Sequence, residues 1–476
     1  MNKREESQTK IGLEIHVQLT RLKTKLFCSC SSDYRNSEPN FMICPTCMGF
    51  PGTLPVINKE AMKFAMLIGL ALECKISKKM LFFRKNYFYP DLAKNFQITQ
   101  YDKAGGIAIA NNGTIVLKSG DKIRIRRIQL EEDPAKISYD GTILNSRYAL
   151  VDYNRSGISL VEIVTEPDIK NPSQAREFLE KLRNILEHLK IVNGDLDGSM
   201  RCDANISLKN LSRVEIKNIS SFKEVERALN FEITRQTTLP SEYNKKMETR
   251  HWDEIRRVTV SLRTKEYEEE YRYFPEPDLL PITFSDKYIN EVKKEIVELP
   301  DQSVLRLVTQ YKINPQVANV LVRNRMLMEF FDTCKDKGEN YKRMANWLST
   351  DVLSYVNRKK IKFNELKLTP ETFLQVISLV DDMIINETKG KKVLYEVLKT
   401  GKIPKEIINQ KKSNQITDKI NINQIIDEIL LKNPDTVKDA GSNDKVIHYL
   451  VGLVMKETSG QILPTEVREA IINKIR

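Results

Sequence analysis

A carboxylate and an imidazole occur close together near the amino terminus, in residues 11–19. Side chains alternate along a strand, so Glu14, His16 and Gln18 are expected on one face and the aliphatic residues between them on the other. A glutamate and a histidine on one face can bind a metal ion or transfer a proton. The alternative for this segment alone is an edge strand with a solvated polar face.

The same alternation recurs downstream. In residues 199–208, Arg201, Asp203 and Asn205 share one face, and small or aliphatic side chains take the other. Residues 213–217 repeat the pattern with charged and aliphatic side chains. Several strands with one apolar face and one face of acids, bases and amides predict a sheet whose polar surface carries chemistry.

Glu162 is a single acid within the apolar run of residues 159–164. Such a run predicts a buried strand, and a buried unpaired carboxylate is costly. Glu162 therefore needs a cation, a metal ion or hydrogen-bond donors nearby. A purely structural ion pair is the alternative.

Three further clusters add acids, cations and aromatic rings. Residues 130–133 hold three consecutive acids, which are either a solvated turn or the hard oxygen donors that Mg²⁺ prefers. Residues 84–91 combine cations with tyrosines, which suits phosphate binding and base stacking. Residues 151–157 place Asn154 and Arg155 in a turn that ends in glycine.

Four cysteines form two close pairs, Cys28 with Cys30 and Cys44 with Cys47. Four thiolates from two short loops can complete a tetrahedral zinc site and hold a segment that has little core of its own. The Cys-x-Cys pair departs from the commoner two-residue gap, and free thiols are the alternative. The other cysteines are isolated and are expected to be small buried hydrophobes.

The composition indicates a protein of roughly two to four domains that meets nucleic acid. The chain has 476 residues and a net charge of +12, although a general excess of lysine could also produce that charge. No apolar run is long enough to span a membrane, and the first residues lack the apolar core of a signal peptide. We therefore expect a reducing compartment.

The candidate site residues must be positioned by the elements around them, and the sequence patterns predict a sheet in the first part of the chain and helices in the rest. Strand patterns fill residues 1–292, and the periodicity turns helical in residues 293–408. Residues 409–414 are polar and indicate a linker, and residues 415–476 form a small helical tail. The expected fold class is α+β, with a mixed or antiparallel sheet followed by an all-helical domain and the tail.

Seven motifs in order resemble the signatures of the B subunit of the glutamyl-tRNA(Gln)/aspartyl-tRNA(Asn) amidotransferase. They are IGLEIHV at 11–17, RKNYFYPD at 84–91, LEED at 130–133, VDYNR at 151–155, LVEIVTEPD at 160–168, RCDANIS at 201–207 and RYFPEPD at 272–278. The motifs cover the first 280 or so residues, and the remainder matches the general layout of that family.

The resemblance implies a glutamine-dependent carbon–nitrogen ligase. In that family, ATP phosphorylates the side-chain carboxylate of a mischarged Glu-tRNA(Gln) or Asp-tRNA(Asn), and ammonia then displaces the phosphate. The chain has no glutaminase signature, so the implied partners in a heterotrimer are an amidase-type glutaminase, which is the A subunit, and a small C subunit. The sequence has no Walker A loop, so any ATP site must be of another kind. The implied location is the bacterial cytoplasm or an organelle.

The resemblance also suggests a role for each candidate residue. Glu14, His16 and Glu132 would hold Mg²⁺, with Glu162 and Asp203 next as catalytic candidates. Phosphate charge would be neutralised by Lys85, Arg155 and Arg201, and substrate or ATP would be oriented by Tyr87, Asn154 and Asn205. The zinc set would be structural, because some members of the family lack it.

Three alternatives remain at this stage. The archaeal E subunit uses Glu-tRNA(Gln) alone, but it carries an inserted domain for which residues 281–301 have no room. A tRNA-binding scaffold without catalysis is expected to have lost its acids, yet Glu14, Glu132 and Asp203 are present. The polar sheet alone also fits a metal-dependent phosphohydrolase.

Overall fold

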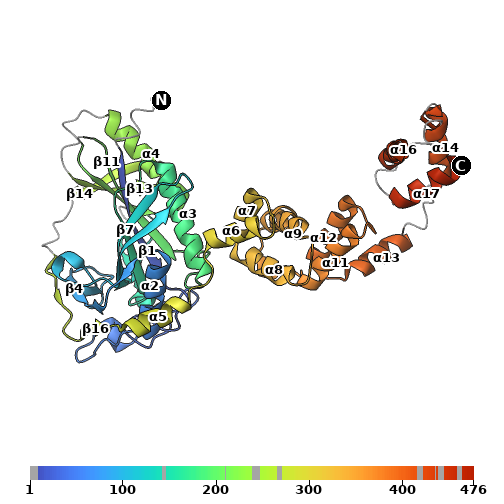
Figure 1. Ribbon diagram of the computed structural model, residues 1–476. Helices are drawn as coiled ribbons and strands as arrows, with labels where there is room; N and C mark the ends of the chain where they lie inside the picture. Colours follow the sequence, from blue (N-terminus) through green and yellow to red (C-terminus); the bar gives the residue numbers. More distant parts are fainter. Residues whose placement is uncertain are drawn as a thin grey trace. The chain divides into compact units, whose positions relative to one another are not determined.

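The computed structural model describes residues 9–141, 146–209, 211–238, 247–264, 271–414, 422–434, 436–437, 444–457 and 464–475. The chain divides into two compact units, Met1–Pro300 and Asp301–Arg476 (Figure 1). The first unit is built on a sheet and the second on helices, which confirms the α+β class. None of the described helices combines the length and apolar character needed to cross a lipid bilayer.

The main sheet of the first unit has nine strands among the described residues. Neighbouring strands are antiparallel, except for the parallel pair β12 and β13. The strands, in their order across the sheet, are β14 (Val258–Thr264), β13 (Glu248–Asp253), β12 (Val214–Ile219), β11 (Met200–Ser207), β1 (Lys10–Gln18), β10 (Ser159–Thr165), β7 (Lys122–Glu132), β6 (Ala110–Val116) and β2 (Lys75–Ile76). The first strand of the chain therefore lies at the centre, between β10 and β11.

One face of this sheet forms the hydrophobic core. Leu13, Ile15 and Val17 of β1 are almost completely buried, as the alternation predicts. The helices of this core are α2 (Lys59–Ala71), α3 (Pro172–His188) and α4 (Phe222–Thr238), and α3 and α4 lie side by side (Figure 1). Helix α3 begins sharply because Asn171 caps it and Pro172 occupies its first position.

Shorter elements complete the first unit, and some of them border the opposite, polar face. A three-stranded sheet in the order β15–β4–β5 contacts β7 through β5. The shorter elements of the first unit are α1 (Pro45–Met48), β3 (Lys79–Met80), β4 (Phe83–Asn86), β5 (Phe96–Thr99), η2 (Asp102–Ala104), β8 (Lys136–Tyr139), β9 (Ala149–Asp152), η3 (Tyr153–Arg155), β15 (Phe274–Pro275), β16 (Ile282–Thr283) and α5 (Asp286–Lys294). The polar face is thus bordered by loops and by a second small sheet.

The second unit contains two separate hydrophobic clusters among the described residues, one within 307–408 and one within 426–471. Its elements are α6 (Pro300–Thr309), α7 (Pro315–Arg323), α8 (Arg325–Lys335), α9 (Tyr341–Trp347), the π-helical turn η6 (Leu348–Val352), α10 (Leu353–Lys359), η7 (Phe363–Glu365), α11 (Pro370–Asp381), α12 (Glu387–Thr400), α13 (Pro404–Asn414), α14 (Ile422–Lys432), α16 (Asp444–Glu457) and α17 (Pro464–Ile475). Thr369 caps α11, and Pro370 occupies its first turn.

Two boundaries differ from the sequence-based expectation. The first unit extends past residue 292 to Pro300, because α5 packs on α2 and Val292 is buried in the first core. Helix α13 continues through Asn414, over the stretch expected to be a linker, since lysine and glutamine are good helix formers. Residues 415–421, where the expected tail begins, lie outside the described residues.

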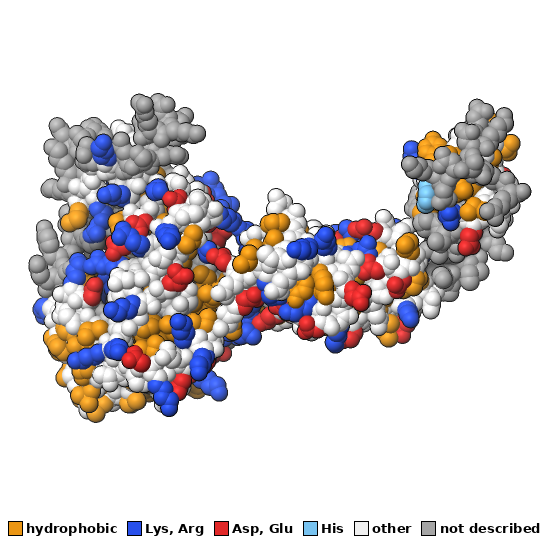
Figure 2. Space-filling view, viewed as in Figure 1, with side chains coloured by type: hydrophobic (Ala, Val, Ile, Leu, Met, Phe, Trp, Pro, Cys, Tyr) orange, Lys and Arg blue, Asp and Glu red, His pale blue; other side chains and the backbone are white. Residues whose placement is uncertain are grey.

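Charge is distributed over the surface of both units. On the face drawn in Figure 2, lysine and arginine side chains lie across the surface with aspartate and glutamate side chains between them. The net charge of +12 therefore gives little guidance to the position of a site on that face. The site has to be found from local geometry.

We predict that Gly113→Ala destabilises the first unit. A Cβ at Gly113, on β6, would lie 2.3 Å from Cys74 Sγ and 2.6 Å from the Leu72 carbonyl oxygen, so the backbone must shift. Overpacking of this kind costs about 1–3 kcal/mol of unfolding free energy. The matched control is Gly12→Ala, whose Cβ would be 3.8 Å from the nearest atom, Cα of Pro167. Chemical denaturation of both variants should show a loss in the first alone; equal stability would contradict the close packing.

Candidate functional site

His16 lies at the middle of the polar face because β1 lies at the middle of the sheet. Its registered neighbours are Glu162 on β10 and Arg201 on β11. Glu14, two residues earlier on the same face, is opposite Asp203 of β11. Strand pairing alone thus gathers three acids and an arginine around one imidazole.

The side chains converge on the Nε2 atom of His16. Glu131 Oε1 lies 3.3 Å from it, Glu162 Oε2 lies 3.8 Å from it, and Glu14 Oε1 lies 3.9 Å from it. One ligand atom each from Glu14, His16 and Glu162 lies within 4.8 Å of the other two, close enough to hold one metal ion. Oxygen donors with a single imidazole suit a hard divalent cation such as Mg²⁺.

The close approach of these groups shifts the pKa values of His16 and Glu162. Burial disfavours the imidazolium, but the hydrogen bond and charge of Glu131, with the charges of Glu162 and Glu14, outweigh burial and raise the pKa of His16 to about 9. Burial and the charges of Glu14 and Glu131 raise the pKa of Glu162 to about 8. A metal ion bound by His16 and Glu162 would displace the protons that these raised pKa values retain, because metal ligands must be deprotonated.

Glu131 and Glu132 point to opposite sides of β7. Glu131 reaches His16, whereas Glu132 forms an ion pair with Lys94 and accepts a hydrogen bond of 3.0 Å from the Ile98 amide. The sequence analysis placed Glu132 with Glu14 and His16, but the structure brings Glu131 there instead. Counting alternation along β7 would have found this, because Gln129 and Glu131 share one face.

Further polar groups support the buried acids. Glu162 accepts a hydrogen bond of 3.0 Å from Gln129 Nε2 and lies 3.4 Å from an Arg127 guanidinium nitrogen. Lys217 Nζ lies 3.3 Å from Asp203 Oδ2. The sequence analysis placed Lys217 on a polar strand face without giving it a role. It missed Arg127 and Gln129, for which the polar face of β7 was the available signal.

A cleft opens over this polar face. It consists of two hollows of about 540 and 450 Å³, which share the lining residues Glu14, Lys85, Glu131, Glu162 and Lys217. Asn205 lines the first hollow, and His16, Arg201 and Asp203 line the second. Most of the predicted site residues are therefore brought together around one space.

One side of the cleft is formed by β4, which carries Lys85, and by the loop after it, which carries Tyr87. The Lys85 ammonium lies 4.7 Å from the ring centre of Tyr271 and 5.6 Å from that of Tyr87. The Tyr87 ring meets the Tyr271 ring edge to face at 6.0 Å. Burial raises the pKa of Tyr87 above its usual range. Tyr87 thus supports the lysine and does not itself line either hollow.

Two predicted residues, Arg155 and Asn154, serve the surrounding loops. Asp133, whose side chain is fully buried, accepts a 2.7 Å hydrogen bond from Arg201, and Arg155 Nε lies 3.7 Å from it. Arg155 also donates to the carbonyl oxygens of Pro134 and Ala135. Buried Asn154 donates to the carbonyl oxygen of Glu38 and accepts from the Met42 amide. Asn154 and Arg155 do not line the cleft hollows.

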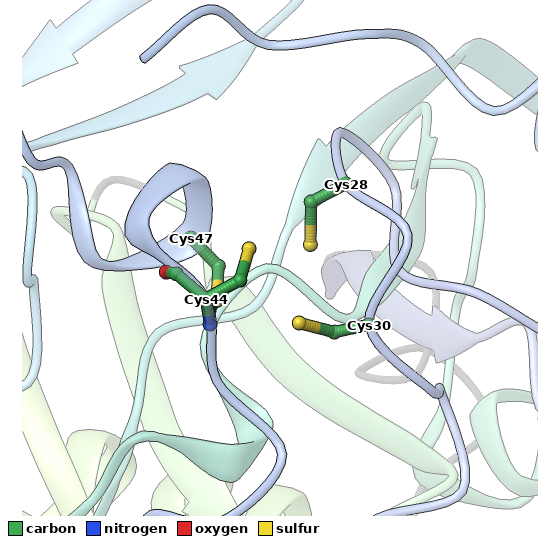
Figure 3. Close-up of side chains that lie close together, drawn as sticks. All are labelled: Cys28, Cys30, Cys44 and Cys47. Atoms are coloured by element: carbon green, nitrogen blue, oxygen red, sulfur yellow. Dashed lines mark hydrogen bonds between the residues drawn. The ribbon is translucent and has the colours of Figure 1, made fainter. Parts of the chain in front are cut away.

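The four clustered cysteines form a second site. Cys28 and Cys30 lie on one loop, and Cys44 and Cys47 lie at helix α1, with the sulfur atoms directed into the space between them (Figure 3). The four Sγ atoms are all within 4.8 Å of one another. A hydrogen bond from Cys28, opposed by burial and assisted by the charge of Lys25, lowers the pKa of Cys47 to about 5. Four thiols with one readily ionised fit a tetrahedral zinc ion.

Comparison with known proteins agrees with this geometry. Residues 9–290 match the family model described as the GatB/GatE catalytic domain, and residues 329–475 match the one described as the GatB domain. The aspartyl/glutamyl-tRNA(Asn/Gln) amidotransferase B subunit of Sulfolobus acidocaldarius is 50% identical over 464 residues, which are 97% of this chain and 98% of the relative. The protein of the same name from Thermotoga maritima is 44% identical over 478 residues, 98% of both chains. The chain therefore belongs to the family of aspartyl/glutamyl-tRNA(Asn/Gln) amidotransferase B subunits.

Proposed function

We propose that this chain activates and amidates the side-chain carboxylate of a mischarged Glu-tRNA(Gln) or Asp-tRNA(Asn). The observation that carries the proposal is the group of three carboxylates around His16, at the floor of a cleft that also presents Lys85. A carboxylate resists attack by ammonia because oxide is a poor leaving group. Phosphorylation by ATP supplies a better one, and such transfer depends mainly on positioning and charge neutralisation.

Glu14, His16 and Glu162 are the proposed magnesium ligands, and Glu131 orients His16. Bound magnesium would neutralise phosphate charge. Lys85 faces the same space and is the proposed phosphate contact from the rim. The contact of its ammonium with the Tyr271 ring holds the side chain over the cleft.

The remaining candidates divide into two groups. The first group lines the cleft and is proposed to contact substrate or ATP; it consists of Arg201, Asn205, and Asp203 with its partner Lys217. Positioning roles are proposed for residues that support these groups from outside the two hollows, namely Tyr87, Glu132, Asn154 and Arg155. Each of these already has a protein partner that fixes a loop or a strand end.

Ammonia is proposed to come from an amidase-type glutaminase, the A subunit, with a small C subunit to complete a heterotrimer in the cytoplasm. The relatives are named as subunits, which supports an assembly. In this assembly the chain acts as the kinase and transamidase part of a glutamine-dependent carbon–nitrogen ligase. The cysteine site is proposed to hold a structural zinc ion.

We predict that His16→Ala and Glu131→Gln each lower tRNA-dependent amidation by about 100-fold or more in the reconstituted complex, because each removes part of the charge arrangement at the cleft floor. Glutamine hydrolysis by the partner should persist. Product formation is measured on both mischarged tRNAs. Glu180→Gln, on an exposed ion pair of α3, is the control and should keep full activity. Near-normal activity of both site variants would instead favour a non-catalytic tRNA scaffold.

For the cysteines, we expect one tightly held zinc ion per chain and a lower melting temperature in Cys44→Ser, because a zinc site ties together loops that have little core. Metal content is measured by elemental analysis of protein purified without chelator. Cys334→Ser is the control, since Cys334 lies in the core of the helical unit, and it should retain zinc. Absence of zinc from the wild-type protein would refute the metal assignment.

We propose that the helical tail contacts the body of the tRNA while the cleft holds the acceptor end. We therefore predict that ending the chain after Asn414 weakens binding of charged tRNA by about tenfold or more, because this second contact is lost. Helices α14, α16 and α17 have their own hydrophobic cluster, so the rest should stay folded. Amidation should fall mainly at low tRNA concentration. Affinity and melting temperature of the truncated complex are both measured. Unchanged affinity would refute the tRNA role, and a lowered melting temperature would assign the tail to packing.

A further inference from the structure

Lys25 is a fully buried lysine, with 0% of its surface exposed. Its ammonium donates a hydrogen bond of 2.8 Å to the Met42 carbonyl oxygen and lies 3.7 Å from Cys47 Sγ. Within the part of the chain that the structure describes, no carboxylate lies within 4.0 Å of the ammonium. A buried ammonium without a counter-charge is costly, so the thiolate is the group that can offset its charge.

Lys25 also joins the two halves of the cysteine site. Its amide donates a 2.9 Å hydrogen bond to the Cys30 carbonyl oxygen, in the loop that carries the first pair. Its side chain crosses to Met42 and Cys47, in the segment that carries the second pair. Buried Asn154 fixes Met42 in turn, through a 2.7 Å hydrogen bond from the Met42 amide. The ammonium is therefore held in place from its own segment and from the facing loop.

We infer that Lys25 is the charge partner of the cysteine site, and that it sets the affinity of the site for zinc. This inference rests on the zinc ion proposed above. A zinc ion with four thiolates has a net double negative charge, which is unfavourable in a buried position. An ammonium beside Cys47 offsets half of that charge and donates toward the sulfur, as groups behind metal ligands commonly do.

A neighbouring lysine shows that this arrangement is specific. Lys94 also borders the cysteine site, but its ammonium pairs with Glu132 and lies 5.4 Å from the ring centre of Phe96. Its charge is thus already balanced by a carboxylate. Lys25 has the sulfur as its anionic neighbour, so its removal should alter the metal site itself.

The test uses Lys25→Met, which keeps the unbranched shape, and Lys25→Gln, which keeps a hydrogen-bond donor without the charge. Lys23→Met removes an exposed lysine two residues away and is the control. The zinc dissociation constant of each full-length protein is measured by competition with a chelator. Both Lys25 variants should bind zinc about 10- to 100-fold more weakly than the wild type, and the control should match the wild type.

Melting temperatures with and without zinc separate the charge role from simple packing. A charge partner is expected to enlarge the rise in melting temperature that zinc produces, so this rise should shrink in both Lys25 variants. The inference would be overturned if the Lys25 variants lost the same amount of melting temperature with and without zinc. It would also be overturned if Lys25→Gln bound zinc with wild-type affinity, or if neither variant folded in the presence of zinc. A wild-type chain that binds no zinc would instead refute the proposed metal site.

Discussion

The alternation of side chains along β1 is the constraint on which the rest of the first unit depends. Leu13, Ile15 and Val17 are anchored in the core, and this fixes Glu14 and His16 on the opposite face. A slip of one residue would expose the aliphatic set and bury the charged set. Because β1 is central, its register also determines which residues of β10 and β11 meet His16. The same burial that stabilises the sheet therefore positions the acidic cluster.

Sequence patterns predicted this arrangement where alternation was regular and missed it where the side chains depend on distant partners. The polar faces of β1 and β11 could be assigned residue by residue, Glu162 could be singled out within the apolar run of β10, and the cysteine spacing indicated a four-thiol cluster. The acids at 130–133 were treated as one group, although consecutive strand residues cannot share a face. Asn154 looked available for a ligand, but loops that precede it by more than 100 residues use its hydrogen bonds. No local pattern carries that information.

The end of β7 connects the two sites of the first unit. Glu131 faces the acidic cluster, whereas its neighbour Glu132 faces Lys94 and the hollow beside the cysteines. Gly157, with φ of +83°, lies against this junction: a Cβ there would be 3.5 Å from Cys47 Cβ and 3.6 Å from Lys25 Cδ. Its amide donates to the Asp133 carbonyl oxygen, and its carbonyl oxygen accepts from the Leu26 amide. The cysteine loops therefore brace the strand that carries Glu131.

The central place of β1 has a consequence for biosynthesis. This strand is synthesised well before its partners β10 and β11, which begin only at Ser159 and Met200. Until residue 207 has been translated, at least one hydrogen-bonding edge of β1 lacks its native neighbour, and its aliphatic face has no complete core to enter. Exposed edges and apolar strands favour unwanted association. The nascent chain must therefore keep β1 shielded until β11 has been synthesised.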